Sequence, residues 1–254
     1  MLSVPLLLGI LVAPTWHWRV LILLVAACGF FLVRFPLALL VKSRKRKQPE
    51  RGYYWRWTAI YGGITTLCGL WLVFGQALWW LLPMGLFGGG LLLFHLWLVA
   101  LRQEMSVIGE MSGIIGLSMG ATMAYYTASN LLNGTALALW FINVLYFGGT
   151  VFYIKLKVRQ QPRQPPPPQA SQRLLSAKAC LVYQTIALTL VLLLVTLNLA
   201  PLLVPLAFVP ATAKILHGAW QWQDKKSLSL MRLGITEMVH VTAFTLLVLL
   251  AFLA

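Results

Sequence analysis

Apolar runs of about 20 residues, separated by short charged islands, constrain this chain more than any other feature. Hydrophobic residues make up 60% of its 254 residues, and only five residues are acidic. A run of this length with few charges is typical of a transmembrane helix, because about 20 helical residues cross the hydrocarbon core. We therefore predict an all-α fold, a polytopic transmembrane helix bundle that forms a single domain over residues 1–254. The nine predicted spans are residues 2–13, 18–41, 57–75, 77–101, 112–129, 135–154, 179–197, 201–216 and 233–253.

Two long apolar stretches are each divided into two of these spans. A single helix over residues 57–101 would reach far beyond a hydrocarbon core of about 30 Å, so the chain must turn back, and we place the turn at Gly75 and Gln76. Residues 179–216 contain Asn198, Pro201 and Pro205, and proline cannot continue a helix.

The basic residues predict the orientation in the membrane. The chain has 20 Lys and Arg residues and a net charge of +15. Eighteen of the 20 lie in or beside the loops that follow even-numbered predicted spans, whereas Arg19 is the one in an opposite loop and Arg34 lies inside a span. The positive-inside rule then places the N-terminus and the even-numbered loops in the cytoplasm. We predict a multi-pass protein of the cell (inner) membrane, with membrane lipids and no nucleic acid as partners of the positive charge.

The longest loop, residues 157–178, contains four consecutive prolines from Pro165 to Pro168. Such a run forms an extended segment, so we predict a Pro-rich cytoplasmic loop between two halves of the bundle, with a docking motif for a soluble partner as the alternative. The three cysteines lie in apolar runs without a C-x-x-C spacing. We predict no metal site and no cofactor, and haem ligation by His95 and His240 is a weaker alternative.

Four glycines fall on one face of the predicted helix over residues 112–129 and its N-terminal flank. Gly109, Gly113, Gly116 and Gly120 are spaced by four, three and four residues. Small residues let helices pack closely in lipid, which is the first interpretation of this face. The alternative is that the bare backbone leaves room for a ligand. Gly116 to Gly120 also fits G-x-S-x-G, but a transmembrane helix lacks the strand-turn-helix context of that catalytic motif.

Ionisable groups inside the predicted spans are the main indication of a site, because a charge at membrane depth is costly unless it pairs or lines a cavity. Arg34, His95 and Glu237 each lie five to eight residues from the nearest basic residue at the cytoplasmic end of their span. That spacing puts them about 8–12 Å inside the boundary, at a similar depth. We expect a polar pocket that opens to the cytoplasm, and structural ion pairs such as Arg34 with Glu237 are the alternative. The candidate pocket residues are Arg34, His95, Arg102, Glu104, Glu110, His217, Asp224, Arg232, Glu237 and His240.

Several segments carry a resemblance to a known family. The chain opens with MLSVPLLLG, its second span ends near Arg34-Phe-Pro, and residues 102–126 read RQEMSVIGEMSGIIGLSMGATMAYY. With the R-L-G-x-x-E pattern from Arg232 to Glu237, these segments resemble the YwiC-like family of integral membrane proteins. The resemblance implies a membrane protein without an established activity. Family members usually carry His-Gly-Ala-Trp-Ala just before the position of Met1, so we expect the natural start to lie upstream. The His-Gly-Ala-Trp of this chain lies in the last cytoplasmic loop instead, from His217 to Trp220.

The nine-span layout is also similar to that of UbiA-type prenyltransferases. Those enzymes hold magnesium with Asp-rich motifs after the second and sixth spans, whereas this chain has one aspartate, Asp224, in neither place. Three functions stay open. The first is a cytoplasm-facing polar pocket that binds a lipid headgroup or an amphipathic small molecule. The second is a UbiA-related enzyme acting on an isoprenoid or lipid without the Asp and magnesium site, and the third is a small-solute transporter. No catalytic motif occurs in its required context, so the sequence gives no positive indication of an enzyme.

Overall fold

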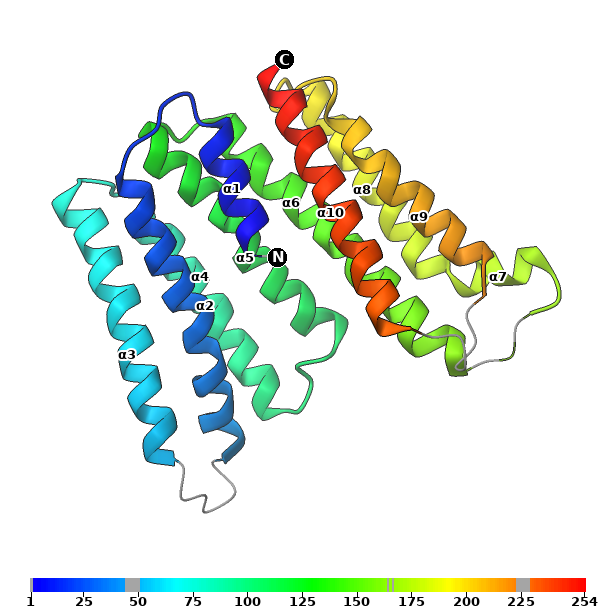
Figure 1. Cartoon of the computed structure of the whole chain (residues 1–254), viewed down its shortest axis with the longest axis horizontal. Helices are drawn as coiled ribbons and strands as arrows, with labels where there is room; N and C mark the ends of the chain where they lie inside the picture. Colours follow the sequence, from blue (N-terminus) through cyan, green and yellow to red (C-terminus); the bar gives the residue numbers. More distant parts are fainter. Residues whose placement is uncertain (1, 44–50, 164, 166, 223–228) are drawn as a thin grey trace. The chain divides into compact units, whose positions relative to one another are not determined.

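A computed structural model describes residues 2–43, 51–163, 165, 167–222 and 229–254. The described residues are helical, without strands, which confirms the predicted all-α class. The chain divides into two compact units, Met1–Trp140 and Phe141–Ala254, and each is described by itself (Figure 1). The prediction of one transmembrane domain over the whole chain stays a prediction.

Unit 1 is built on α2 and α5. Helix α2 packs along α3 and also contacts α4 and α5, and α1 packs against α5 (Figure 1). Buried side chains such as Leu6, Leu23 and Leu72 form a core near the α1 end of the unit. The elements are α1 Ser3–Val12, α2 Arg19–Ser43, α3 Arg51–Leu70, the π-helical turn η1 Trp71–Gly75, α4 Leu81–Ala100, α5 Val107–Ser129 and the first residues of α6 Gly134–Lys155.

The helix ends of unit 1 follow local sequence signals. The predicted turn at Gly75 and Gln76 is confirmed, since η1 ends at Gly75 and Ala77 takes a left-handed backbone with φ of 54°. Ser106 caps the start of α5, where its hydroxyl accepts a hydrogen bond from the Gly109 amide at 3.1 Å. Asn130 ends α5 with φ of 58°, a conformation that asparagine tolerates better than most residues.

Unit 2 packs α8, η4, α9 and α10 against one another. Phe147, Phe208 and Phe244 fill its interior, and the Tyr146 ring stacks on Phe244 with ring centroids 3.7 Å apart. The elements after Phe141 are the remainder of α6, the π-helical turn η2 Leu156–Gln160, the 3₁₀ turn η3 Gln161–Arg163, α7 Ala170–Ser176, α8 Lys178–Thr196, the 3₁₀ turn η4 Val204–Phe208, α9 Val209–Trp220 and α10 Leu230–Leu253.

Seven helical segments of the described residues are long and apolar enough to cross a membrane, so the chain is a multi-pass membrane protein with about seven spans. The prediction of nine spans is wrong. The first predicted span forms α1, whose 10 residues extend only about 15 Å. The eighth is split where η4 gives way to the 12-residue α9, with Pro205 and Pro210 at the starts of the two pieces. Without nine spans the comparison with the UbiA layout loses its basis.

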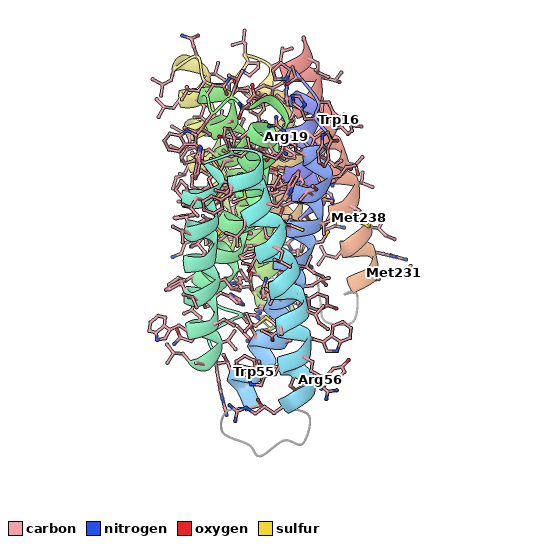
Figure 2. All side chains as sticks on the ribbon, turned by 90° about the vertical axis from the view of Figure 1, so that its left-hand side faces the viewer. Trp16, Arg19, Trp55, Arg56, Met231 and Met238 are labelled. Atoms are coloured by element: carbon pink, nitrogen blue, oxygen red, sulfur yellow. The ribbon has the colours of Figure 1, made fainter. Side chains whose placement is uncertain are left out.

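Exposed aromatic residues gather at both ends of unit 1. Figure 2 shows Trp16 and Arg19 at one end and Trp55 and Arg56 at the opposite end, and both tryptophans are exposed. Tryptophan and tyrosine prefer the two membrane–water interfaces. The two clusters therefore mark where unit 1 meets the lipid headgroups, with α2 to α5 between them.

Candidate functional site

The candidate residues from the sequence fall into both units. Arg34, His95, Arg102, Glu104 and Glu110 lie in unit 1. His217, Arg232, Glu237 and His240 lie in unit 2, and Asp224 lies outside the described residues. Two separate local sites are therefore described, one in each unit.

The unit 1 site is a half-open pocket between α2, α4 and α5, with a volume of about 40 Å³. That volume holds about three water molecules and is well below the 300–1,000 Å³ of a drug-sized ligand site. Aromatic and leucine side chains form most of the wall, including Phe30, Phe31 and Leu91. Arg34, His95 and Ser112 are its polar residues. The pocket thus offers a small polar end inside an apolar wall.

Glycines shape this pocket in part. Gly113 and Gly116 of the predicted glycine face line it, and a methyl group built on Gly113 would lie 3.8 Å from Nη1 of Arg34. The other two glycines of the face pack tightly, because a methyl group on Gly120 would meet Leu6 at 3.3 Å and one on Gly109 would meet the Glu104 carbonyl oxygen at 2.7 Å. The face therefore serves both interpretations, close packing at its ends and open space at its centre.

Arg34 brings a positive charge that its surroundings do not cancel. Among the described residues it makes no hydrogen bond or ion pair, and Glu104 is the carboxylate within electrostatic reach. Glu104 is itself bound to Lys42, whose Nζ lies 2.7 Å from Oε1. Two cations thus share one carboxylate. A half-buried guanidinium whose N–H groups make no hydrogen bond within the described residues can bind a carboxylate or phosphate through two parallel hydrogen bonds.

His95 is the second polar group of the pocket and is only 5% exposed. The backbone of Gly109 lies beside its ring, while Nδ1 has no partner within the part of the chain that the structure describes. A buried polar atom without a partner is unfavourable unless water or a ligand meets it. The ring nitrogen therefore identifies a position where a bound group would gain a hydrogen bond.

The loop between α4 and α5 positions Glu104 beside this pocket. It starts at Arg102, an exposed residue with a left-handed φ of 57°, which costs a non-glycine residue about 1–2 kcal/mol. It ends at the Ser106 cap, and the absence of a side chain at Gly109 allows the Glu104 carbonyl to approach α5. Glu110 follows in the first turn of α5 and is half-buried.

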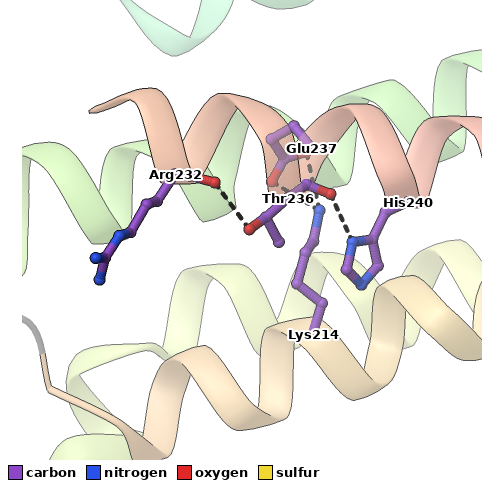
Figure 3. Close-up of polar contacts among 5 residues, drawn as sticks. All are labelled: Lys214, Arg232, Thr236, Glu237 and His240. Carbon is purple, nitrogen blue, oxygen red and sulfur yellow. Dashed lines mark hydrogen bonds and ion pairs between the residues drawn. The ribbon is translucent and has the colours of Figure 1, made fainter. Parts of the chain in front are cut away.

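The unit 2 site centres on a buried ion pair between α9 and α10. Nζ of Lys214 lies 2.8 Å from Oε1 and 2.9 Å from Oε2 of Glu237. Figure 3 shows the two side chains pointing toward each other from the two helices. The side chains are only 5% and 13% exposed. Lys214 also lies over the Tyr153 ring, 4.7 Å from its centroid. Glu237, for which one alternative was a pair with Arg34, therefore has Lys214 as its ion-pair partner.

The other predicted residues of unit 2 lie around this pair without joining it. Nδ1 of His240 lies 2.7 Å from the carbonyl oxygen of Thr236, one turn earlier on α10 (Figure 3). Arg232 and His217 are exposed. Among the described residues, no group of three or more His, Cys, Asp or Glu side chains could hold a metal ion.

Sequence reasoning missed both lysines that bind the acidic residues. Lys42 and Lys214 were read as topology markers, because lysines near the ends of apolar runs usually face the headgroups. Lys214 carried a signal that could have found it. It lies inside an apolar run, two residues before the end of that run at Leu216. The nearest charged residue after it is Asp224, ten residues further on, and the nearest before it is Lys178.

Comparisons with known proteins agree with the resemblance to the YwiC-like family. A family described as YwiC-like protein matches residues 1–125, a segment that contains every residue of the unit 1 pocket. The uncharacterised protein YwiC of Bacillus subtilis (strain 168) is 25% identical over 165 residues, which cover 63% of this chain and 64% of that protein. The match thus covers less than two thirds of that relative's length. No solved structure matches the chain.

Proposed function

Because the chain is YwiC-like over residues 1–125, a resemblance that the comparisons confirm, we propose a function for the pocket within that segment. The pocket binds an amphipathic molecule with an anionic headgroup, held at Arg34, and an apolar tail against the Phe30 and Leu91 side of the wall. The observation that carries the proposal is the uncancelled charge of Arg34 at the end of a largely apolar pocket.

The size and chemistry of the pocket restrict the ligand. A volume of about 40 Å³ admits a group the size of a phosphate but not a whole headgroup or lipid, so the rest of the ligand must lie outside this space, along the helices. Nδ1 of His95 has no partner among the described residues, and it accepts a hydrogen bond when the neutral ring carries its proton on the other nitrogen. A headgroup that carries a hydroxyl beside its phosphate would therefore satisfy Arg34 and His95 together.

Orientation and location belong to the same proposal. The charged end of unit 1, with Lys42, Arg51 and Arg102, faces the cytoplasm of a cell (inner) membrane. The excess of lysine and arginine on that side supports this placement. Reporter fusions after residue 48 and after residue 76 test it, and a cytoplasmic signal from the second position would contradict it.

The binding experiment uses purified protein in detergent and two probes with the same acyl chains, phosphatidylglycerol and phosphatidylcholine. We expect native mass spectrometry to show preferential retention of phosphatidylglycerol, and Arg34→Gln to weaken it about 10- to 100-fold. That range follows from the 1.5–3 kcal/mol of a hydrogen bond to a charged group. Geranylgeranyl diphosphate is a third probe, and its preferential retention would assign the same pocket to an isoprenoid.

The matched control is Arg56→Gln, which removes the same charge from an exposed position of α3 (Figure 2). It should leave retention unchanged. Equal losses in the two variants would show that binding depends on general surface charge, and no loss in Arg34→Gln would contradict the proposal. Thermal unfolding of both variants establishes that they are folded.

A further inference from the structure

A continuous polar face runs along α6 in unit 2. Six buried residues follow one another at spacings of three or four, with an average of 3.6 residues, and so share one side of the helix and its continuation through η2 and η3. They extend over about 27 Å, close to the thickness of the hydrocarbon core. The polar face of α6 comprises Asn143, Tyr146, Thr150, Tyr153, Lys157 and Gln161.

Neighbouring helices of unit 2 add polar groups to this face. Gln184 of α8 donates to the hydroxyl of Thr212 on α9 at 2.8 Å, and its Oε1 would lie 3.2 Å from a methyl group on Gly149 of α6. The Lys214–Glu237 pair lies against Tyr153. This many polar side chains inside one membrane-spanning unit are expensive, and in such proteins they usually mark the path of a proton or an ion.

The protein satisfies some of these groups, since Lys157 donates to the Gln221 carbonyl and Nε2 of Gln161 donates to the Gly218 carbonyl, but two features show atoms that keep unused hydrogen-bonding capacity. The Tyr146 hydroxyl and Oε1 of Gln161 are buried without a hydrogen-bond partner among the described residues. Both oxygens of Glu237 bind the same ammonium group, and no other hydrogen bond to them is formed within the described chain. A carboxylate accepts about four hydrogen bonds, so Glu237 keeps free acceptor positions. Buried polar atoms of this kind are where internal water binds.

We propose that unit 2 contains a hydrated proton-binding site in which Glu237 takes up the proton and the polar face of α6 leads to it. The proton arrives through water from the Gln161 end of this face and bonds to a carboxylate oxygen of Glu237. The carboxyl group is then neutral, and the ion pair with Lys214 is lost. The Tyr153 ring, already beneath the ammonium group, remains as its partner.

Among the described residues, few other charged groups surround Glu237. Tyr146 and Tyr153 of α6 and Cys180 of α8 lie within electrostatic reach of its carboxylate. Lys214 faces it from α9, and His240 lies on its own helix, bonded to the Thr236 carbonyl. Lys214 is thus the cation beside the carboxylate among these groups, and the proton exchange depends on this one pair.

Infrared difference spectroscopy tests the proposal, because a protonated carboxyl group has a C=O band that a carboxylate lacks. Spectra of the purified wild-type protein are recorded between a neutral and an acidic buffer, in H₂O and in D₂O. We expect a carboxyl band that shifts in D₂O and that is lost in Glu237→Gln. Glu50→Gln, which removes another of the five acidic residues of the chain, is the matched control and should keep the band.

A second variant covers the case in which Glu237→Gln fails to fold with Lys214 unpaired. The double variant Lys214→Gln with Glu237→Gln removes both charges together, which a buried pair tolerates better than the loss of one partner. It should fold and lack the band. A band that persists in either folded variant, or that is absent from the wild-type protein, would overturn the proposal. Phosphatidylglycerol retention, which depends on unit 1, should be unchanged in these variants.

Discussion

Among the described glycines of unit 1, Gly9 leaves the least room for a methyl group, and its replacement by alanine tests the packing of α1. A methyl group at this position would collide with the backbone carbonyl oxygen of Ala121 and would lie 2.9 Å from Cβ of Ala124, both on α5. Neither atom can rotate away, since one is backbone and the other is attached to it. Gly9 also ends the opening MLSVPLLLG segment, which lies within the residues that the YwiC-like family matches.

The expected magnitude comes from a comparison of two glycines. Gly90 lies on α4 with no atom within 4 Å of a built methyl group. Each change to alanine gains about 1 kcal/mol of helix propensity, so this gain cancels between the two variants. Overpacking costs about 1–3 kcal/mol, and the rigid backbone contact favours the upper part of that range. Gly9→Ala should thus be less stable than Gly90→Ala by about 2–3 kcal/mol.

The measurement is the midpoint of thermal unfolding in detergent. Samples are heated to a series of temperatures, and the fraction that remains folded is then measured by size-exclusion chromatography. For a domain of this size about 2–4 °C corresponds to 1 kcal/mol, so the two variants should differ by about 5–10 °C. Gly90→Ala should melt at or slightly above the wild-type temperature. A Gly9→Ala protein that melts as high as Gly90→Ala would refute the close approach of α1 to α5.

Three further outcomes are expected. Gly218→Ala should destabilise unit 2 by about 1–3 kcal/mol in thermal unfolding, because a methyl group there would lie 2.5 Å from the Tyr153 ring. Lys214→Met should cost about 3–5 kcal/mol, and adding Glu237→Met should recover most of it; equal melting of the single and double variants would argue against the buried pair. His95→Leu should remove an approximately fivefold preference for phosphatidylglycerol over phosphatidylmethanol, which lacks the headgroup hydroxyls, since one hydrogen bond contributes about 1 kcal/mol. An unchanged ratio in native mass spectrometry would exclude a hydroxyl partner for His95.

Hydropathy predicted the long helices correctly, because a membrane-spanning helix forms all its backbone hydrogen bonds within its own segment. Its presence therefore depends on the local sequence and not on neighbouring helices. The turn at Gly75 followed from length alone. The count of nine spans was wrong for segments that are apolar but do not form a helix long enough to cross a membrane. Residues 2–13 are apolar but form a helix of only 10 residues, and residues 201–216 include prolines that divide them.

The candidate sites depended on contacts that a linear sequence does not show. Depth along each helix placed Arg34 and His95 at one level, and the structure has both in one pocket. Depth could not give the rotation of each helix, so it could not tell which acid meets which base. The roles of Lys214 and of the polar face of α6 were missed for the same reason. Both depend on which side of a helix is buried, and the sequence does not show that side.

Pro36 lies inside α2, two residues after Arg34 and six before Lys42. Proline has no amide hydrogen, so the carbonyl of Leu32 lacks its usual partner and the helix is weakened at this point. The two cations therefore stand on either side of a joint. Bending of α2 at Pro36 would let Lys42 keep its ion pair with Glu104 while the position of Arg34 changes to fit headgroups of different size.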